Sequence, residues 1–409
     1  MKILQLSPRS VFPPDDGGKI GIANISRELN HLGAEITLFY YYNDESELNN
    51  YIYNNELLEL LPYKHSTENT LFRIIKSFLT NRSIYICKHI NDEVKEFFRN
   101  YLLENHFDII HVDHSAMAPL GLYIQSLTNV PIALRLHNIE YTIWERYAKR
   151  LSKLDPRYYF IKQQAILLKS YEKKMYPKMD VCFAITEEDL KLAKQMSPSA
   201  NIVLASAGVN LSELKPDKQL ERNIFTLIHA TNYKWIHNTD ALMWFSENVL
   251  SKLSEKYPEI KLDLLGKDLP DSLASSSNFI NPIGYVPSII PYMSKAGIYI
   301  APLFVGGGIR IKILEAMALG LPIVASPIAA EGIKAKEKDG LFIAKNAEDF
   351  IKYISYLIDN PVTSAKLGEA AREFIIKHYA WEQNVKIMFD IYKQLVDKYD
   401  NKHVIEFQR

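Results

Sequence analysis

The chain has 409 residues, of which 47% are hydrophobic and 23% charged, and its 48 basic residues balance 48 acidic ones. This length exceeds one ordinary hydrophobic core, so two domains are expected. The charge balance argues against a general nucleic-acid-binding protein, which needs a basic excess to neutralise phosphates. Cys87 and Cys182 stand alone in apolar runs and build neither a disulfide framework nor a zinc site.

The N-terminal apolar run is far shorter than a signal peptide, and no run of about 18 apolar residues follows. The sequence therefore predicts a cytoplasmic protein.

Short apolar segments typical of strands alternate with longer segments of helical periodicity, a pattern typical of parallel βαβ units. The first helix is expected to begin after Gly17-Gly18 and to end at Gly33. The strands expected in the first half are 3–6, 35–40, 109–112, 132–136, 181–185 and 202–204. Those expected in the second half are 225–229, 262–265, 298–301, 323–325 and 341–343.

The polar segment 208–222 contains Pro216 and lacks apolar periodicity, which indicates an interdomain linker. We therefore expect an α/β protein with two Rossmann-like domains, 1–207 and 223–380. A helix over 381–409 either caps the second domain or crosses back to the first. Because ligands bind outside the carboxyl ends of strands in such sheets, the central cleft that the two domains face is the expected site.

The segment 298–326, IYIAPLFVGGGIRIKILEAMALGLPIVAS, is the most informative part of the chain. It reads as a strand, a loop with Gly306-Gly307-Gly308, a helix, a stop at Gly320 and another strand. Glycines let backbone amides approach a ligand, and a helix start attracts anions. Arg310 and Lys312 add two cations, so the predicted ligand is a diphosphate.

Glu315 lies one helical turn further on, within reach of a ligand whose phosphates occupy the helix start. A carboxylate is the usual partner of ribose hydroxyls. The alternative is that Glu315 pairs with Lys312 on one helix face. The spacing alone leaves both interpretations open.

The run EAMALGLPIVAS, Glu315 to Ser326, resembles the signature of the large retaining glycosyltransferase family called group 1 or family 4, which has the GT-B architecture. The resemblance implies that Glu315 holds the donor's ribose. It also implies that the diphosphate is held by the loop amides and two cations, a set made up of Gly306, Gly307, Gly308, Ile309, Arg310 and Lys312. The family's first glutamate falls at Gly307 here, which removes a clue to the sugar. A branch of the family with a GGG-x-[Arg/Lys]-x-Lys loop is similar to this chain, so the change does not indicate lost activity.

Three further segments carry candidate residues. The Pro-rich segment 7–19 is similar to the family's first loop, and Gly17 and Gly18 would admit an acceptor or the donor phosphate; a plain turn is the alternative. His137 and Asn138 follow a strand. The resemblance implies that His137 faces the cleft near the transferring sugar, and a capping role is the alternative.

Lys234 stands near the position where the family commonly has a phosphate-gripping Lys, but at a shifted spacing. Either Lys234 replaces that cation or Arg310 and Lys312 act without it. The run 111–114, His-Val-Asp-His, superficially resembles a metal site, but adjacent strand residues point to opposite faces. The family needs no bound metal, so neither a metal nor a cofactor is expected.

Residues 146–178 contain ten Lys or Arg and only two acids, Asp155 and Glu172, with tyrosines and leucines interleaved. One interpretation is a basic amphipathic surface that rests on the inner face of an anionic membrane and meets a lipid-linked acceptor. The other is a solvated helical face.

The resemblance implies transfer of a sugar from a nucleotide diphosphate sugar to a glycan or lipid-linked acceptor, with retention at the anomeric carbon and without a metal. The catalytic residues expected are His137, Arg310 and Lys312, the last two stabilising the leaving diphosphate. Alternatives are a nucleotide-sugar epimerase of the same fold and a non-catalytic nucleotide-sugar-binding subunit. A dehydrogenase is disfavoured because no G-x-G-x-x-G follows the first strand.

Overall fold

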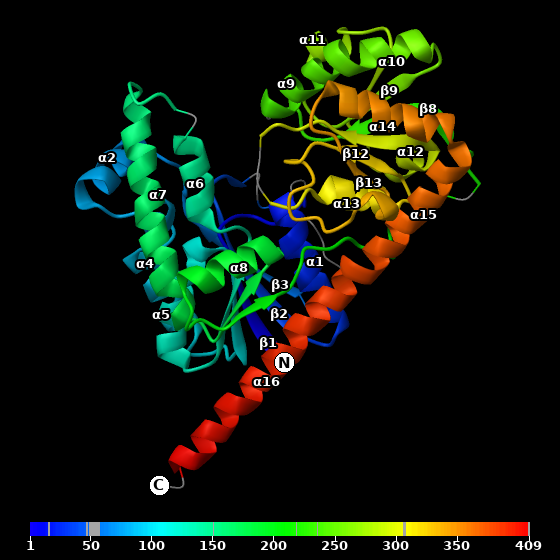
Figure 1. The fold of residues 1–409 in the computed structure, drawn as a ribbon. Coiled ribbons are helices and arrows are strands. Elements are labelled where there is room, and N and C mark those ends of the chain that lie inside the picture. The colour runs from blue at the N-terminus through cyan, green and yellow to red at the C-terminus, as the bar shows by residue number, and fades with distance from the viewer. Residues whose placement is uncertain are drawn as a thin grey trace. The chain divides into compact units, whose positions relative to one another are not determined.

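The computed structural model describes residues 1–14, 17–45, 48, 58–149, 151–217, 219–234, 236–305 and 308–407. The chain forms two compact units (Figure 1). The first unit comprises Met1–Ser206 together with Glu382–Arg409, and the second comprises Ala207–Trp381. Residues 207–222 thus belong to the second unit, where Val209 bridges to Ala380.

The described strands of the first unit form one parallel sheet in the order β3-β2-β1-β4-β5-β6-β7. Its strands are β1 (Lys2–Ser7), β2 (Glu35–Tyr42), β3 (Leu58–Lys64), β4 (Ile109–Asp113), β5 (Ile132–Leu136), β6 (Val181–Ala184) and β7 (Ile202–Leu204). The α-helices are α1 (Gly17–His31), α2 (Leu71–Thr80), α3 (Ile84–Cys87), α4 (Asp92–Tyr101), α5 (Ala118–Thr128), α6 (Glu140–Ala148), α7 (Pro156–Met175) and α8 (Glu187–Met196). Short 3₁₀ turns cover Ser115–Met117 and Tyr176–Lys178.

The second unit repeats this plan with the order β10-β9-β8-β11-β12-β13, again all parallel. Its strands are β8 (Asn223–Ala230), β9 (Lys261–Leu265), β10 (Ile280–Gly284), β11 (Ala296–Ala301), β12 (Ile323–Ala325) and β13 (Leu341–Ile343). Its α-helices are α9 (Ile236–Phe245), α10 (Ser251–Lys256), α11 (Asp271–Ala274), α12 (Ile290–Lys295), α13 (Ile311–Ala318), α14 (Ala347–Asp359) and α15 (Pro361–His378). A π-helical turn over Ser246–Leu250 joins α9 to α10, and a 3₁₀ turn covers Glu337–Asp339.

The order of the strands is that of a Rossmann fold in both units, which confirms the predicted α/β class. Every strand predicted from the sequence is present, with ends that differ by at most two residues. The sequence analysis missed β3 and β10, which lie at the sheet edges. Both contain proline and polar residues, as edge strands can, and so lack the continuous apolar run of a buried strand.

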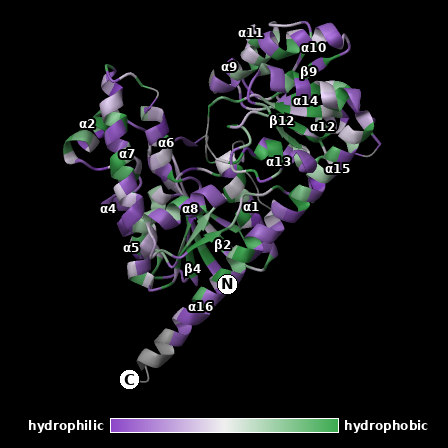
Figure 2. Ribbon diagram, viewed as in Figure 1, coloured by the Kyte–Doolittle hydropathy of each residue, from purple (hydrophilic) through white to green (hydrophobic). Residues whose placement is uncertain are grey.

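Hydrophobic residues concentrate on the strands, while the helices mix apolar and polar residues (Figure 2). In a parallel sheet helices cover both faces, so the inner strands become nearly continuous apolar runs. Strands β4, β5, β11 and β12 are accordingly buried along their whole length. Among the described residues, no helix combines the length and the apolarity needed to traverse a bilayer.

The last helix, α16 (Trp381–Phe407), belongs to the first unit from Glu382 onward. The Tyr392 hydroxyl, fully buried, forms a hydrogen bond with His111 Nδ1 on β4. The Tyr399 hydroxyl donates to the Asp180 carboxylate at 2.9 Å. The C-terminal helix therefore returns to the first unit, the second of the two alternatives that the sequence left open.

Candidate active site

In each sheet the strand order reverses once, between β1 and β4 in the first unit and between β8 and β11 in the second. In open parallel sheets ligands bind outside the carboxyl ends of the strands at such a switch point. The loops that matter are therefore those after β1, β4 and β5 in the first unit, and those after β8 and β11 in the second.

In the second unit the loop after β11 leads into α13 and contains the predicted glycines. Gly306 and Gly307 lie outside the described residues. Gly308 has a φ of +73°, which glycine adopts without strain. Ser326, at the end of β12, donates from its hydroxyl to the Leu303 carbonyl and so ties this loop to the neighbouring strand.

The start of α13 carries the features of an anion site. Arg310 is its N-cap residue, and the Arg310 side chain makes no capping hydrogen bond. The backbone N–H groups of the first turn of a helix lack intrahelical partners, and the helix dipole makes this end positive. Arg310 Nη1 donates to the Gly308 carbonyl at 3.3 Å, which holds the guanidinium beside the loop.

Lys312 Nζ donates to Glu315 Oε2 at 2.7 Å, so the ion pair foreseen as the alternative for Glu315 is present. The Lys312 side chain is 38% exposed and that of Glu315 is 13% exposed. A pair with this spacing on a helix surface contributes about 0.5 kcal/mol or less. Such a weak pair can open when a phosphate and a ribose offer competing partners, so the ion pair is compatible with a ligand-binding role.

Lys234 lies in the loop after β8, on the same edge of the sheet as Arg310 because β8 and β11 are parallel neighbours. The side chain of Asn238 holds this loop by donating to Thr231 Oγ1 at 2.8 Å and to the Asn232 carbonyl at 2.9 Å. The fold thus brings Lys234, Arg310 and Lys312 to one edge of the second sheet.

Most residues of the signature run after Glu315 belong to the hydrophobic core. From Ala316 to Leu319 every side chain is buried, and Gly320 ends the helix at a φ of +77°. The buried residues of β12 continue the same core. The sequence signature therefore reflects the packing of α13 against the core as well as any role in ligand binding.

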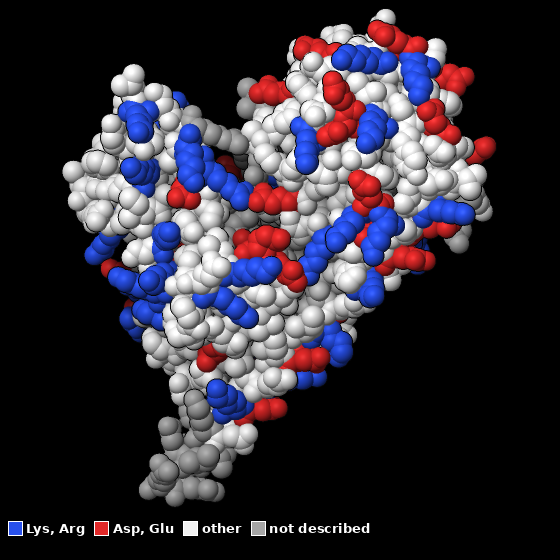
Figure 3. All heavy atoms as spheres, viewed as in Figure 1, with Lys and Arg blue, Asp and Glu red and all other residues white. Residues whose placement is uncertain are grey.

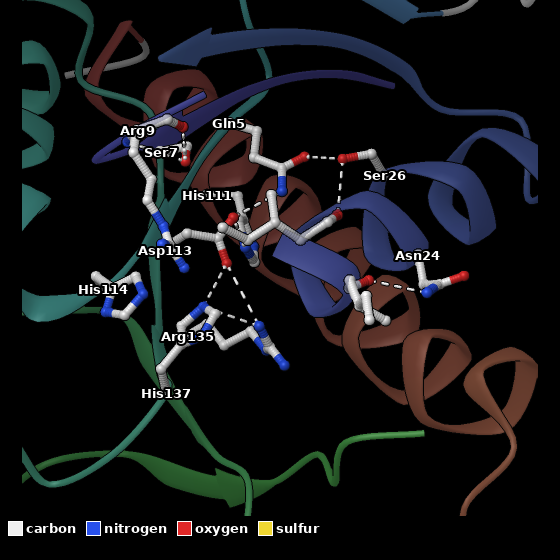
Figure 4. A network of polar contacts seen from close by, with 12 residues as sticks. Gln5, Ser7, Arg9, Asn24, Ser26, His111, Asp113, His114, Arg135 and His137 are labelled. Carbon is white, nitrogen blue, oxygen red and sulfur yellow. Dashed lines mark hydrogen bonds and ion pairs between the residues drawn. The ribbon is translucent and has the colours of Figure 1, made fainter. Parts of the chain in front are cut away.

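In the first unit, polar side chains interrupt three adjacent buried strands (Figure 4). Gln5 on β1 lies opposite His111 on β4, and Asp113 on β4 lies opposite Arg135 on β5. Gln5 Nε2 donates to Asp113 Oδ2 at 2.7 Å, and Ser26 Oγ on α1 donates to Gln5 Oε1 at 2.7 Å.

Asp113 carries a fully buried negative charge. Its Oδ2 lies 3.3 Å from His111 Nε2, and its Oδ1 lies 3.7 Å from Arg135 Nη1. Burial opposes ionisation, but His111 and His137 together outweigh it, and the pKa of Asp113 is well below its usual range. The carboxylate is therefore ionised at neutral pH.

His137, predicted as catalytic, belongs to this network. Burial and the charge of Arg135 lower the pKa of His137 to about 4, so the ring is neutral at physiological pH. Arg135 Nη1 lies 2.9 Å from His137 Nε2, and a guanidinium can only donate. The same nitrogen lies 3.2 Å from Asp113 Oδ1, and a carboxylate can only accept, so Nε2 lies between a donor and an acceptor. The parallel ring of His114 stacks on His137 with 3.9 Å between the centroids.

The predicted Gly17 and Gly18 begin α1, and His137 and Asn138 follow β5, so these four residues share the carboxyl edge of the first sheet. A third glycine, Gly21, brings α1 close to the network. A Cβ atom at Gly21 would lie 3.1 Å from the Arg135 guanidinium nitrogens. The sequence analysis did not single out Gly21.

Two buried carboxyl groups, also missed, lie beside the network. Glu172 on α7 accepts from the backbone N–H groups of Glu140 at 2.9 Å and Tyr141 at 3.2 Å, and so caps α6. Burial raises the pKa of Glu172 to about 7, and burial together with Glu172 raises that of Glu140 to about 8. Glu140 Oε1 lies 3.9 Å from His114 Nδ1. Glu140 is thus protonated at neutral pH.

Gln5 and Arg135 could have been predicted as functional residues because each is a polar residue inside an apolar strand. For Asp113 the signal was His111, two positions earlier and on the same strand face. Among the described residues, no group of His, Cys, Asp and Glu side chains is arranged to hold a metal ion.

Two family descriptions match the chain. Glycosyltransferase Family 4 matches residues 16–213, and Glycosyl transferases group 1 matches residues 225–360. The chain belongs to the GT-B glycosyltransferase family. It is 25% identical over 257 residues to an uncharacterised glycosyltransferase of Haemophilus influenzae, covering 59% of this chain and 66% of that protein, just under two thirds of its length.

Solved structures share the fold of this chain over nearly its whole length. Sucrose-phosphate synthase from Thermosynechococcus elongatus has a TM-score of 0.73 at 16% identity, covering 97% of this chain and 100% of that one. Anabaena HepE in complex with UDP and glucose has a TM-score of 0.67 at 12% identity, covering 96% and 100%. At these identities the likeness establishes the fold alone.

The raised pKa of Glu140 predicts a pH-dependent stability. Between about pH 4.5 and pH 8 the unfolded chain releases this proton while the folded chain keeps it, so wild-type stability falls as pH rises. The isosteric Glu140→Gln variant lacks this loss. Its unfolding free energy relative to wild type should increase by up to about 1.4 kcal/mol per pH unit over this range.

Urea denaturation at pH 5.5 and 7.5 measures the difference, with Glu145→Gln, exposed on the same helix, as the matched control. An equal difference at both pH values for Glu140→Gln would contradict the assignment.

Proposed function

We propose that this glycosyltransferase moves a sugar from a nucleotide diphosphate sugar to a hydroxyl of a glycan or lipid-linked acceptor, with retention of anomeric configuration and without a metal ion. The observation that carries the proposal is the start of α13, whose N-cap side chain makes no capping hydrogen bond, with Arg310 and Lys312 at the carboxyl edge of the second sheet. The UDP bound in HepE supports a nucleoside diphosphate as the leaving group.

In this proposal the second unit binds the donor. Backbone N–H groups of Gly308, Ile309 and the first turn of α13 donate to the diphosphate oxygens. The planar guanidinium of Arg310 binds two oxygens at once, and Lys312 supplies a point charge. When Lys312 turns to the phosphates, Glu315 is released to accept hydrogen bonds from the ribose hydroxyls. Lys234 adds a third cation from the neighbouring loop.

The reaction breaks the bond between the anomeric carbon and the diphosphate oxygen, and it forms a bond from that carbon to the acceptor oxygen. Negative charge develops on the leaving diphosphate, where preorganised N–H groups and cations stabilise it most. The acceptor hydroxyl approaches from the face that the diphosphate leaves, and its proton passes to the departing phosphate oxygen. Configuration is thereby retained, and the cations fill the role that a metal has in other transferases.

We assign the acceptor to the first unit. Arg135 and Asp113 hold the neutral ring of His137 at Nε2 and so position it. In this proposal Nδ1 of that ring forms the hydrogen bond with a sugar hydroxyl. Asn138 and the glycines at the start of α1 shape the same edge of the sheet. The epimerase and non-catalytic alternatives are disfavoured by the matches to transferase families.

Donor binding is expected to depend on Arg310 and Glu315. One UDP-, GDP- or dTDP-sugar should raise the thermal unfolding midpoint of the wild type. Arg310→Ala and Glu315→Ala should each weaken its binding about tenfold or more, because each loses hydrogen bonds that involve a charged group.

Lys366→Ala and Glu369→Ala, exposed on α15, are matched controls and should bind like the wild type. If no nucleotide or nucleotide sugar shifts the wild type at millimolar concentration, the donor site is wrongly assigned.

Retention of configuration and independence of a metal ion can both be measured directly. With a turned-over donor, the anomeric proton of the product should show by NMR the coupling of the donor's own configuration, and EDTA should leave the rate unchanged. An inverted product, or a rate that EDTA abolishes and manganese restores, would overturn the mechanism. A sugar isomer formed without any acceptor would identify an epimerase instead.

A further inference from the structure

His114 has a backbone conformation that side chains rarely adopt. It directly follows β4 at the carboxyl edge of the first sheet, with a φ of +74° and a ψ of 136°. Glycine occupies this region almost alone, because a Cβ atom makes it unfavourable for other residues. Such positions persist only where the surrounding contacts impose them, and they concentrate at functional sites. The contacts of His114 therefore indicate its role.

The His114 ring is held on two sides. Its face stacks on the His137 ring, with an angle of 8° between the planes. Its Nδ1 atom lies 3.4 Å from the hydroxyl oxygen of Tyr85 on α3 and 3.9 Å from Glu140 Oε1 on α6. Among the described residues Nε2 makes no hydrogen bond, and the side chain is 18% exposed. Nδ1 thus faces buried polar groups, while Nε2 remains available to a ligand.

Glu140 lies beside His114 because another carboxyl group caps its helix. An acidic residue at a helix start is ordinarily stabilised as an anion by the first N–H groups of the helix. In α6 these N–H groups, those of Glu140 and Tyr141, donate to Glu172 from α7. Figure 3 shows acidic side chains interspersed with basic ones on the face in view, whereas Glu140 and Glu172 are both buried. Glu140 is therefore an interior acid beside a histidine and not a surface charge.

The charge of Glu140 affects which ring nitrogen of His114 carries the proton. Glu140 keeps its proton at neutral pH, since burial and Glu172 raise its pKa to about 8. When the carboxyl group ionises, its negative charge lies nearest to Nδ1 and stabilises a proton there. The ring stays neutral throughout, because burial and His137 hold the pKa of His114 well below its usual range. Ionisation of Glu140 therefore lowers the fraction of His114 rings that carry their proton on Nε2.

The surrounding groups distinguish this effect from others. The remaining titratable or charged groups that face Glu140 or His114 are Tyr85, Glu172 and Asp189 from α3, α7 and α8, together with Arg9, Asp113, Arg135 and His137. Burial raises the pKa of Tyr85 well above its usual range, so Tyr85 stays neutral. Glu172, whose pKa is about 7, contacts the backbone of α6. A change in the His114 ring near pH 8 that a Glu140 variant abolishes is therefore due to Glu140.

We propose that His114 is a second acceptor-binding residue and that Glu140 is a positioning residue, which keeps the His114 ring proton on Nε2. From Nε2 the ring donates a hydrogen bond to a hydroxyl oxygen of the acceptor sugar, beside the contact assigned to His137. This inference rests on the proposed function, which assigns the acceptor to the first unit. The strained backbone and the stack on His137 hold the ring in place for that contact.

NMR of the full chain with nitrogen-15-labelled histidine tests the positioning role without any substrate, because ring nitrogen shifts report which nitrogen carries the proton. In the wild type the His114 ring should change from mainly Nε2–H at pH 6.5 toward Nδ1–H at pH 9, with a midpoint of about 8. In Glu140→Gln, whose amide stays neutral, the ring should remain mainly Nε2–H over the whole range. His114→Phe identifies the His114 signals by removing them.

Glu145→Gln is the matched control, since Glu145 is exposed on the same helix, and it should titrate like the wild type. Two results would overturn the proposal. One is a wild-type His114 ring whose proton stays on the same nitrogen across this range. The other is the same change in Glu140→Gln as in the wild type.

The acceptor contact is tested by rate, with a nucleotide sugar selected by the thermal screen and an acceptor sugar that the wild type glycosylates. His114→Phe keeps an aromatic ring for the stack but has no donor nitrogen. It should lower kcat/KM for the acceptor about tenfold or more, with KM for the donor unchanged. His106→Phe, exposed in the loop before β4, should behave like the wild type. An unchanged kcat/KM for the acceptor in His114→Phe would limit the ring to a structural role and overturn the proposal.

Failure of this inference and failure of the donor site are distinguishable. If no nucleotide sugar shifts the wild type, the donor site is wrongly assigned, but the NMR titration still decides whether Glu140 controls the His114 proton. A thermal shift in the wild type together with an unchanging His114 ring would refute only the present inference.

Discussion

All described strands in each unit run parallel, and this constraint places every candidate functional loop. Parallel strands have their carboxyl ends at one edge, so residues far apart in the sequence meet there. In the second unit that edge collects Lys234 from one loop and Arg310 and Lys312 from another. In the first unit it collects the start of α1 and the loop of His137.

The first unit also accommodates an ionised carboxylate within a fully buried strand. A buried charge is tolerated only when it is paired and hydrogen-bonded, and Asp113 has Gln5, His111 and Arg135 around it. Through His111 the network reaches Tyr392 on the C-terminal helix. Asp113 and Arg135 both contact Nε2 of the neighbouring His137, so a stabilising network also orients a candidate functional group.

Periodicity predicted the fold well, because inner parallel strands are nearly continuous apolar runs. It missed β3 and β10, whose edge positions remove that pattern. Burial was harder to predict: Glu172 counted as a surface charge in the sequence, yet it caps α6 from the interior. The spacing of Lys312 and Glu315 was compatible both with a ribose-binding carboxylate and with an ion pair. The ion pair became apparent only in the structure.

The central claim is that the start of α13 binds the donor diphosphate. Hydrogen–deuterium exchange with and without UDP tests it most directly, since amides that donate to phosphate exchange slowly. The account predicts slower exchange in peptides covering 302–315, and to a smaller extent 230–238, with α15 unchanged. Protection confined to other segments, with 302–315 exchanging equally in both states while UDP is bound, would contradict it.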